Sequence, residues 1–441
     1  MSYETIALLM FASMAVLLLT GQRVFAAIGF VAAGAALLLY GPGAIEMPFS
    51  AAFKLFNWFA MLTLPMFIYM GYVLAESGIA DDLYRALHVW FGRFRGGLAI
   101  GTIVLMVIIS AMNGLSVAGM AIGATIALPE MLRRGYDKLL ISGVVQGGSS
   151  LGILVPPSVV LVLYGMIARQ PVGQLWLAGV FPGLLMAALF IAYVVIITKI
   201  NPKLAPVVTD EELNMPLIEK LKLARAGIIP FLIFFSMMGL FVMGVLSLVE
   251  SSVFGAVAAT LAAALKRRLT FKTIHQIAHK TMSVSAMFLW LILAALAFGA
   301  IFDGLGASRA IESLFINDWQ LDRWQIMIMI MASFIVLGMF LDDTAMLVIV
   351  APLYIPLVKA LEFNLIWFGI LYTITCQIAY ITPPFGYNLF LMRSMAPKEI
   401  TLTDIYRSIM PFLLIMVLTI VLLMIFPEIA LWLPSQIYTK G

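Results

Sequence analysis

Residues Gly147–Ser158 read GGSSLGILVPPS and lie inside a long apolar run that otherwise resembles a membrane helix. Three glycines and two adjacent prolines interrupt this helix, because Pro156 and Pro157 have no backbone N–H and push the preceding residue toward an extended conformation. Freed carbonyls in hydrocarbon cost several kcal/mol each unless they are buried in protein or bind something. The stretch therefore predicts a helix broken within the membrane, and a break of this cost indicates a function.

The composition is that of a membrane protein. Of 441 residues, 63% are hydrophobic and 11% are charged, and the mean hydropathy is +1.09. Apolar segments long enough to span a bilayer recur along the chain, which excludes a soluble domain. The net charge of +4 comes without a basic tail that would indicate nucleic-acid binding, and the single cysteine, Cys376, excludes an internal disulfide. Met1–Thr20 has no Lys or Arg before its apolar run, which favours a retained span over a secretory signal.

Two apolar stretches, residues 97–132 and 325–361, are too long for one span, and each is interrupted in the middle. The first contains Asn113–Ser116 (NGLS) and the second contains Asp342–Thr344 (DDT). Each half has about 15–17 residues and extends about 25 Å, which is short for a hydrocarbon core of about 30 Å. We interpret both stretches as re-entrant hairpins whose tips are buried in protein or line a cavity. Two short full spans are the alternative.

The distribution of Lys and Arg favours this topology. With the N-terminus outside and both stretches as hairpins, 20 of the 26 basic residues face the cytoplasm and 6 face outward, in the sense of the positive-inside rule. If only one stretch were a full crossing, part of the chain would reverse and the bias would be lost. The first hairpin then opens to the cytoplasm and the second to the outside.

The two halves of the chain repeat each other. Pro129 and Pro356 are separated by 227 positions, and the second break reads ITPPFG at residues 381–386. Pro156 and Pro383 are separated by the same 227 positions. A hairpin, a proline and a span broken by Pro-Pro thus occur twice, with opposite predicted orientation. Inverted repeats with discontinuous helices are typical of secondary transporters, whose sites lie near the membrane midplane at the breaks.

The predicted fold is an all-α polytopic membrane protein of two inverted-topology halves joined by a polar linker. The first half is predicted at 1–200, with a hairpin at 97–132 and a broken helix at 139–167. A cytoplasmic linker is predicted at 201–225. The second half is predicted at 226–441, with a hairpin at 325–361, a broken helix at 365–392 and a last span at 405–430. Basic segments at 80–95 and 266–280 are predicted to be amphipathic helices at the membrane surface.

Four breaks meet if the repeat holds, and their oxygen atoms suit a small hard cation. Asn113–Ser116 and Gly147–Pro157 offer Asn and Ser oxygens and free carbonyls, which are ligands for an ion such as Na⁺. Gly338–Thr344 and Ala379–Gly386 add two aspartates, whose burial near the midplane is costly without a partner cation. The alternatives are close helix packing for the glycines, structural kinks for the proline pairs and a solvated turn for the aspartates.

Other chemistry has little support in the sequence. His275 and His279 are spaced like a metal pair but have no third ligand nearby. Neither a GxxxxGK[ST] nor an HExxH motif occurs. The sequence therefore favours neither ATP coupling nor an intramembrane metalloprotease, and we expect no cofactor and no metal other than Na⁺.

At these breaks the sequence resembles the large membrane subunit of the TRAP (tripartite ATP-independent periplasmic) transporters, a DctM-type permease. The likeness covers essentially the whole chain in order, and the two Pro-Pro motifs together are specific. The matching segments are Arg95–Ala99, Gly135–Asp137, Gly147–Ser158, Tyr164–Gly165, Leu175–Gly183, Gly338–Asp342 and Thr382–Phe390.

The resemblance implies a Na⁺-driven, elevator-type importer in a bacterial inner membrane, and the topology predicted from Lys and Arg places both termini in the periplasm. It implies a small four-span membrane subunit and a periplasmic substrate-binding protein as partners, and an organic acid or a related solute as substrate. No further four-span block precedes Met1, so the chain is expected to be the large subunit alone. The predicted sodium-binding residues are Asn113, Gly114, Ser116, Ser149, Ser150, Gly152, Gly338, Asp342, Asp343, Thr344, Thr382 and Pro383. The predicted substrate-binding residues are Pro156, Pro157, Ser158, Pro384, Gly386, Asn388 and Arg309.

Two departures from the family pattern bear on these assignments. Many relatives have Ser-Gly-Ser at the first hairpin tip, so that Asn113 or backbone replaces one serine here. Relatives often carry an arginine suited to a substrate carboxylate where this chain reads DGLG at residues 303–306, and the next basic residue is Arg309. Either Arg309 takes this role, or helix N-termini bind the anion, or the substrate is not a typical carboxylate.

Two alternative functions stay open at this point. A stand-alone Na⁺/dicarboxylate symporter of related inverted-repeat design needs neither partner. A membrane enzyme or a protein-export pore is more distant, because the spans offer no convincing nucleophile, base or metal cluster and because a pore would leak ions.

Overall fold

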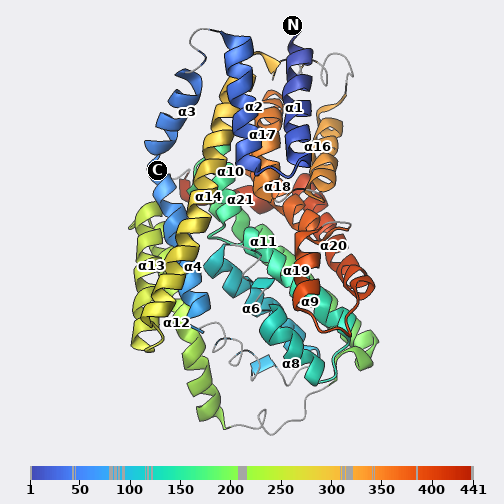
Figure 1. The fold of residues 1–441 in the computed structure, drawn as a ribbon. Helices are drawn as coiled ribbons and strands as arrows, with labels where there is room; N and C mark the ends of the chain where they lie inside the picture. The colour runs from blue at the N-terminus through green and yellow to red at the C-terminus, as the bar shows by residue number, and fades with distance from the viewer. Residues whose placement is uncertain are drawn as a thin grey trace.

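The computed structural model describes residues 2–41, 44, 46–78, 83, 87, 90–91, 95–114, 116, 119–120, 123–206, 216–307, 309, 313, 321–339, 341, 343–383 and 386–438. Within these ranges every regular element is helical (Figure 1), in agreement with the predicted all-α class. The amphipathic helix predicted at 80–95 lies mostly outside the described residues.

The helices carry the labels of Figure 1. They are α1 Tyr3–Leu19, α2 Val24–Ala35, α3 Glu46–Phe56, α4 Thr63–Glu76, α6 Gly97–Asn113, α8 Leu128–Arg133, α9 Lys138–Ser150, α10 Val159–Ala168, α11 Val172–Ile200, α12 Leu217–Val242, α13 Leu248–Leu265, α14 Phe271–Gly304, α16 Arg323–Gly338, α17 Asp343–Ala360, α18 Leu365–Ile381, α19 Tyr387–Met395, α20 Leu402–Ile425 and α21 Glu428–Tyr438. Of the described helices, α11, α13, α14 and α20 are each long and apolar enough to cross a membrane. Together with shorter apolar helices, they make this a multi-pass membrane protein.

Two boundaries differ from the sequence-based prediction. Helix α14 runs without interruption over 34 residues, so the separate surface helix predicted at 266–280 is wrong. No glycine or proline occurs between Phe271 and Phe298 to end the helix, whose length of about 51 Å exceeds the hydrocarbon core. Helix α12 begins at Leu217, inside the predicted linker, because the charged residues of this stretch are compatible with a helix that extends beyond the apolar layer.

The helices form two groups that meet along α14. Helix α14 packs against α2, α3 and α4, and α13 packs between α4 and α12. In the second group, α9 contacts α6, α18 and α20, while α18 also contacts α16 and α11. Figure 1 shows α16 and α17 at the end of the molecule where α1 and α2 lie, and α8 at the opposite end. Helices are interrupted at each of the four places where the sequence predicts a break.

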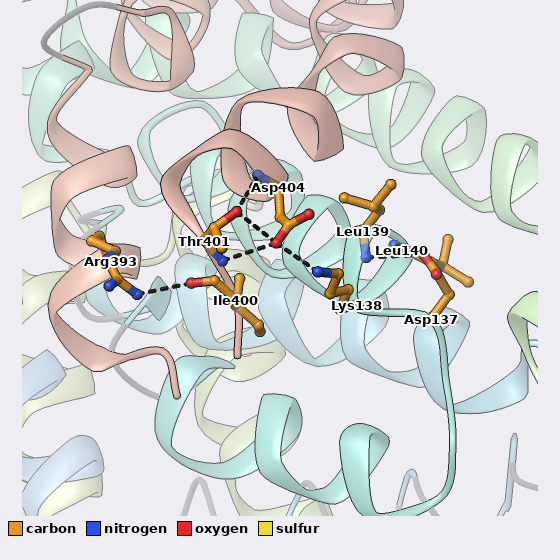
Figure 2. A network of polar contacts seen from close by, with 8 residues as sticks. All are labelled: Asp137, Lys138, Leu139, Leu140, Arg393, Ile400, Thr401 and Asp404. Atoms are coloured by element: carbon orange, nitrogen blue, oxygen red, sulfur yellow. Dashed lines mark hydrogen bonds and ion pairs between the residues drawn. The ribbon is translucent and has the colours of Figure 1, made fainter. Parts of the chain in front are cut away.

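Helix α9 of the first half packs closely on α20 of the second half. A Cβ atom added to Gly143 would lie 2.4 Å from the Ser408 carbonyl oxygen, and one added to Gly147 would lie 2.4 Å from the Phe412 ring. Small residues four positions apart permit this close approach of two helices in a membrane. At the end of this interface, the Lys138 ammonium lies 2.7 Å from the carboxylate of Asp404, which also caps the start of α20 (Figure 2).

Replacing Gly147 by alanine should lower the thermal unfolding midpoint of the detergent-solubilised protein. Overpacking of this kind costs about 1–3 kcal/mol, which outweighs the gain of up to about 1 kcal/mol that alanine brings within a helix. Gly239 of α12 is a matched control, because no atom lies within 4 Å of its added Cβ. Gly239→Ala should leave the midpoint unchanged or raise it, and equal increases in both variants would contradict the packing argument.

Candidate functional site

The first break joins α9 to α10 through a fully enclosed segment. Helix α9 ends at Ser150 and continues as a single 3-10 turn, and the chain then passes through Pro156 and Pro157 to Ser158, the N-cap of α10. The Ser158 hydroxyl accepts a hydrogen bond from the Leu161 N–H at 3.2 Å. Ser149, Ser150 and Ser158 are at most 1% exposed. The local sequence thus folds as predicted, with a short irregular segment buried in protein.

The serine hydroxyls of this break donate their protons to nearby carbonyls. The Ser149 hydroxyl donates to the Gln146 carbonyl at 2.9 Å, and the Ser150 hydroxyl donates to the Gly147 carbonyl at 2.7 Å. The Ser158 hydroxyl donates to the Ile153 carbonyl. Because the proton is committed in each case, each hydroxyl oxygen keeps acceptor capacity for a cation.

The first hairpin tip packs against this break. The Gly114 carbonyl accepts a hydrogen bond from the N–H of Val159, the first residue of α10, at 3.3 Å. Gly114 has a φ of +64°, and an added Cβ would lie 2.5 Å from the Pro157 carbonyl oxygen. Ser116 is buried, whereas the side chain of Asn113 lies outside the described residues. The structure therefore brings two of the predicted sodium segments of the first half together.

The second hairpin tip packs against α18. An added Cβ on Gly338, the last residue of α16, would lie 2.3 Å from the Cβ of Ala379. Asp343 begins α17 and is buried, and its carbonyl accepts a hydrogen bond from the Tyr372 hydroxyl at 2.6 Å. Asp342 and the side chain of Thr344 lie outside the described residues. A negative charge in the first turn of a helix interacts favourably with the helix dipole, and Asp343 occupies this position in α17.

The second break has buried residues on both sides of its proline pair, namely Thr382 and Gly386. The Thr382 hydroxyl donates to the Ile378 carbonyl at 2.5 Å, and the Gly386 N–H donates to the Thr382 carbonyl at 3.1 Å. A side chain at Gly386 would meet the carbonyl oxygens of Tyr380 and Thr382 at 2.7 and 2.9 Å. Pro383 is partly exposed, and Pro384 lies outside the described residues.

Among the described residues, two hydrogen bonds join the halves next to these breaks. The amide nitrogen of Asn388 lies 2.9 Å from the hydroxyl oxygen of Ser116, which links a predicted substrate residue to a predicted sodium residue. The amide nitrogen of Gln377 donates to the Ser150 carbonyl at 2.9 Å. Sequence reasoning missed Gln377, whose signal is an uncharged polar side chain within the apolar run of α18.

Three buried amide oxygens have no hydrogen-bond partner among the described residues. They are Oε1 of Gln146, Oε1 of Gln377 and Oδ1 of Asn388. An unsatisfied buried acceptor costs about 1–3 kcal/mol. Amide and hydroxyl oxygens, carbonyls and one carboxylate form a donor set suited to a small hard cation. The part of the chain that the structure describes contains no cluster of three His, Cys, Asp or Glu side chains that could hold a metal ion.

A cavity of about 1380 Å³ lies apart from the breaks and is lined by residues of α3, α10, α14 and α17, among others. Its acidic residues, Glu46 and Asp303, belong to α3 and α14. Arg169, which caps α10, and Lys359 of α17 are its basic residues. Arg309 is exposed and is not among the described residues that line the cavity. The described substrate-binding candidates at the breaks do not line it either.

Known proteins resemble this chain over most of its length. The family model described as "Tripartite ATP-independent periplasmic transporter, DctM component" matches residues 11–429. The C4-dicarboxylate TRAP transporter large permease protein DctM of Pseudomonas aeruginosa is 27% identical, over 90% of this chain and 92% of that protein. The ectoine TRAP transporter large permease protein TeaC of Halomonas elongata is 27% identical, over 85% and 86%.

Two further comparisons concern a longer relative and the fold. The sialic acid TRAP transporter permease protein SiaT of Haemophilus influenzae is 26% identical, over 86% of this chain and 60% of that protein. The crystal structure of the Alcanivorax borkumensis YdaH transporter, described as having an unusual topology, matches with a TM-score of 0.62. It covers 91% of this chain and 90% of that chain at 17% identity, and so it shows the fold alone.

Proposed function

This chain belongs to the DctM component family of the tripartite ATP-independent periplasmic transporters, and we propose that it couples solute import to sodium entry. Family membership confirms the resemblance seen in the sequence and makes the chain a transport subunit rather than an enzyme. In our proposal it is the large subunit of an importer in a bacterial inner membrane, working with a small four-span subunit and a periplasmic binding protein. Both termini face the periplasm.

One observation carries the sodium proposal, namely the hydrogen bond from Asn388 to Ser116 between the two halves. It joins the first hairpin tip to the second break, so that ion and solute ligands adjoin each other. Sodium bound by the serine oxygens and carbonyls of the first site, and by Asp343 and Thr382 of the second, draws the tips against the breaks. The solute then binds between Ser158 and Asn388. Binding of sodium organises the solute site, and binding of the solute organises the sodium sites.

The architecture that we propose is a pair of inverted repeats with a hairpin and a broken helix in each half. The halves are residues 1–200 and 226–441. The separation of Ser150 and Gln377, which touch, is 227 positions, the same offset that relates the proline motifs. The positions of α8 and α17 at opposite ends of the molecule support hairpins that open to opposite sides (Figure 1). In an elevator mechanism, the group around α9 and α18 slides against the group around α14.

The solute that we propose is a small organic acid or a related compound. The relatives are named for C4-dicarboxylates, sialic acid and ectoine. Arg169 and Lys359 line the large cavity together with the acidic residues of α3 and α14, so the cavity suits the passage of a solute that carries both signs of charge as well as an anion.

Reconstitution tests the proposed function. Proteoliposomes that contain this chain with its four-span partner should accumulate solute when an inward sodium gradient and the loaded binding protein are both supplied. Each inward positive charge contributes about 2.3 kcal/mol per 100 mV, so an inside-negative potential should increase uptake when net positive charge moves inward. Full uptake without the binding protein would favour the stand-alone symporter, and uptake indifferent to sodium would refute the coupling.

A further inference from the structure

Gln377 occupies a fully buried position at the junction of the two halves. Its side chain has 0% exposure, and it lies on α18 one turn before that helix ends at Ile381. Its amide nitrogen donates at 2.9 Å to the carbonyl of Ser150, which is the last residue of α9. The final carbonyls of a helix lack helical partners and need others. The Gln377 side chain of the second half therefore binds the backbone of the first half at the point where α9 ends and the break begins.

The orientation of this amide is fixed by chemistry. A carbonyl oxygen only accepts hydrogen bonds, so the atom of Gln377 next to the Ser150 carbonyl must be the nitrogen. The amide oxygen is then buried without a hydrogen-bond partner among the described residues. A glutamine at this position therefore carries a cost that an apolar side chain of similar size would not, and its amide nitrogen provides the hydrogen bond to the break in return.

The contact lies where the repeat places its symmetry axis. If a two-fold rotation relates the halves, each residue corresponds to the one 227 positions later. Ser150 and Gln377 are such a pair, and they touch. A residue in contact with its own counterpart lies at the axis, because the rotation exchanges the two positions. In the proposed repeat, the interaction therefore joins the two broken helices at the two-fold axis between the halves.

We infer that Gln377 is a positioning residue for sodium binding, which orients the Ser150 carbonyl and the adjoining break from across the interface of the halves. This inference rests on the proposed function, since it names a residue that tunes the same ion site. The orientation of the break determines which carbonyls and hydroxyl oxygens converge on the ion, so loss of the amide lowers sodium affinity before it affects the fold.

Gln377→Met provides the test, because methionine has a similar length and volume but cannot donate to the carbonyl. Thr373→Val is the matched control, since Thr373 of α18 is also 0% exposed but its hydroxyl donates to the Gly369 carbonyl within the same helix. In the reconstituted complex, Gln377→Met should raise the half-saturating sodium concentration about five- to tenfold, the effect of one lost hydrogen bond. Thr373→Val should leave it close to the wild-type value. The sodium-dependent rise of the unfolding midpoint, measured in detergent without transport, should shift to higher sodium in the same way.

The outcomes separate this inference from the proposed function. An unchanged half-saturating concentration in Gln377→Met, with a sodium-dependent wild type, overturns the inference alone. Equal increases in both variants also overturn it, because they indicate general loosening. A sodium-independent wild type overturns both. If Gln377→Met does not fold, Gln377→Asn keeps the amide but withdraws it by one methylene, and a wild-type sodium response in that variant counts against the inference.

Discussion

Replacing Gly114 by alanine should reduce sodium-driven uptake at least about tenfold, the effect of a loss of about 1.4 kcal/mol in the assembled site. Gly114 follows α6 with a φ of +64°, and an added Cβ would lie 2.5 Å from the Pro157 carbonyl oxygen. The contact cannot be relieved easily, because the Cβ is fixed to the Gly114 backbone and the oxygen belongs to the Pro157 backbone, and both are packed at the break. The methyl group therefore separates the hairpin tip from α10 and weakens the hydrogen bond from the Val159 N–H.

Gly135 offers a control that isolates the steric effect. It also has a positive φ, +76°, so alanine introduces the same backbone strain of about 1–2 kcal/mol at this position. Its added Cβ lies 3.7 Å from the Pro206 ring, an ordinary contact, and the residue is exposed. Uptake by Gly135→Ala should follow the amount of folded protein. If the two alanine variants lose the same fraction of uptake at equal protein levels, the tip is not part of the site.

The breaks were predictable from the sequence because their causes are local. Pro156 and Pro157 lack N–H groups and Gly114 tolerates a positive φ, and these properties hold whatever surrounds them. The class of fold followed from composition for the same reason. The extent of α14 was not predictable in the same way. Its basic first part and its apolar second part resemble two separate helices in the sequence, although no residue between them ends the helix.

The contacts across the halves could not be predicted, since they depend on how distant segments pack. Ser116 and Asn388 were both candidates, but nothing in their spacing indicates that they touch. Gln377 was not a candidate, because an isolated glutamine in an apolar helix has no motif around it. Its role emerges only when its partner carbonyl is known. The assignment of Arg309 rested on its place in the chain, whereas the large cavity contains Arg169 and Lys359.

The packing around the second hairpin tip also indicates a function for its one described carboxylate. Asp343 is buried where α17 begins, and α17 packs against both α10 and α18. A charge in such surroundings interacts with an ion at 4 Å by about 4 kcal/mol at an effective dielectric constant of 20. The desolvation of the carboxylate is a cost that is present whether or not sodium is bound, so the attraction contributes to sodium affinity and is offset mainly by the desolvation of the ion.

Asp343→Asn should therefore raise the half-saturating sodium concentration at least about tenfold, because the shape of the side chain is kept while the charge is lost. The matched control is Asp322→Asn in the same hairpin. Asp322 is the exposed N-cap of α16 and accepts the Trp324 N–H at 3.0 Å, a role that asparagine fills equally well. This variant should keep the wild-type sodium response. Uptake measured over a range of sodium concentrations distinguishes the cases, and an unchanged response in Asp343→Asn would remove this carboxylate from the sodium site.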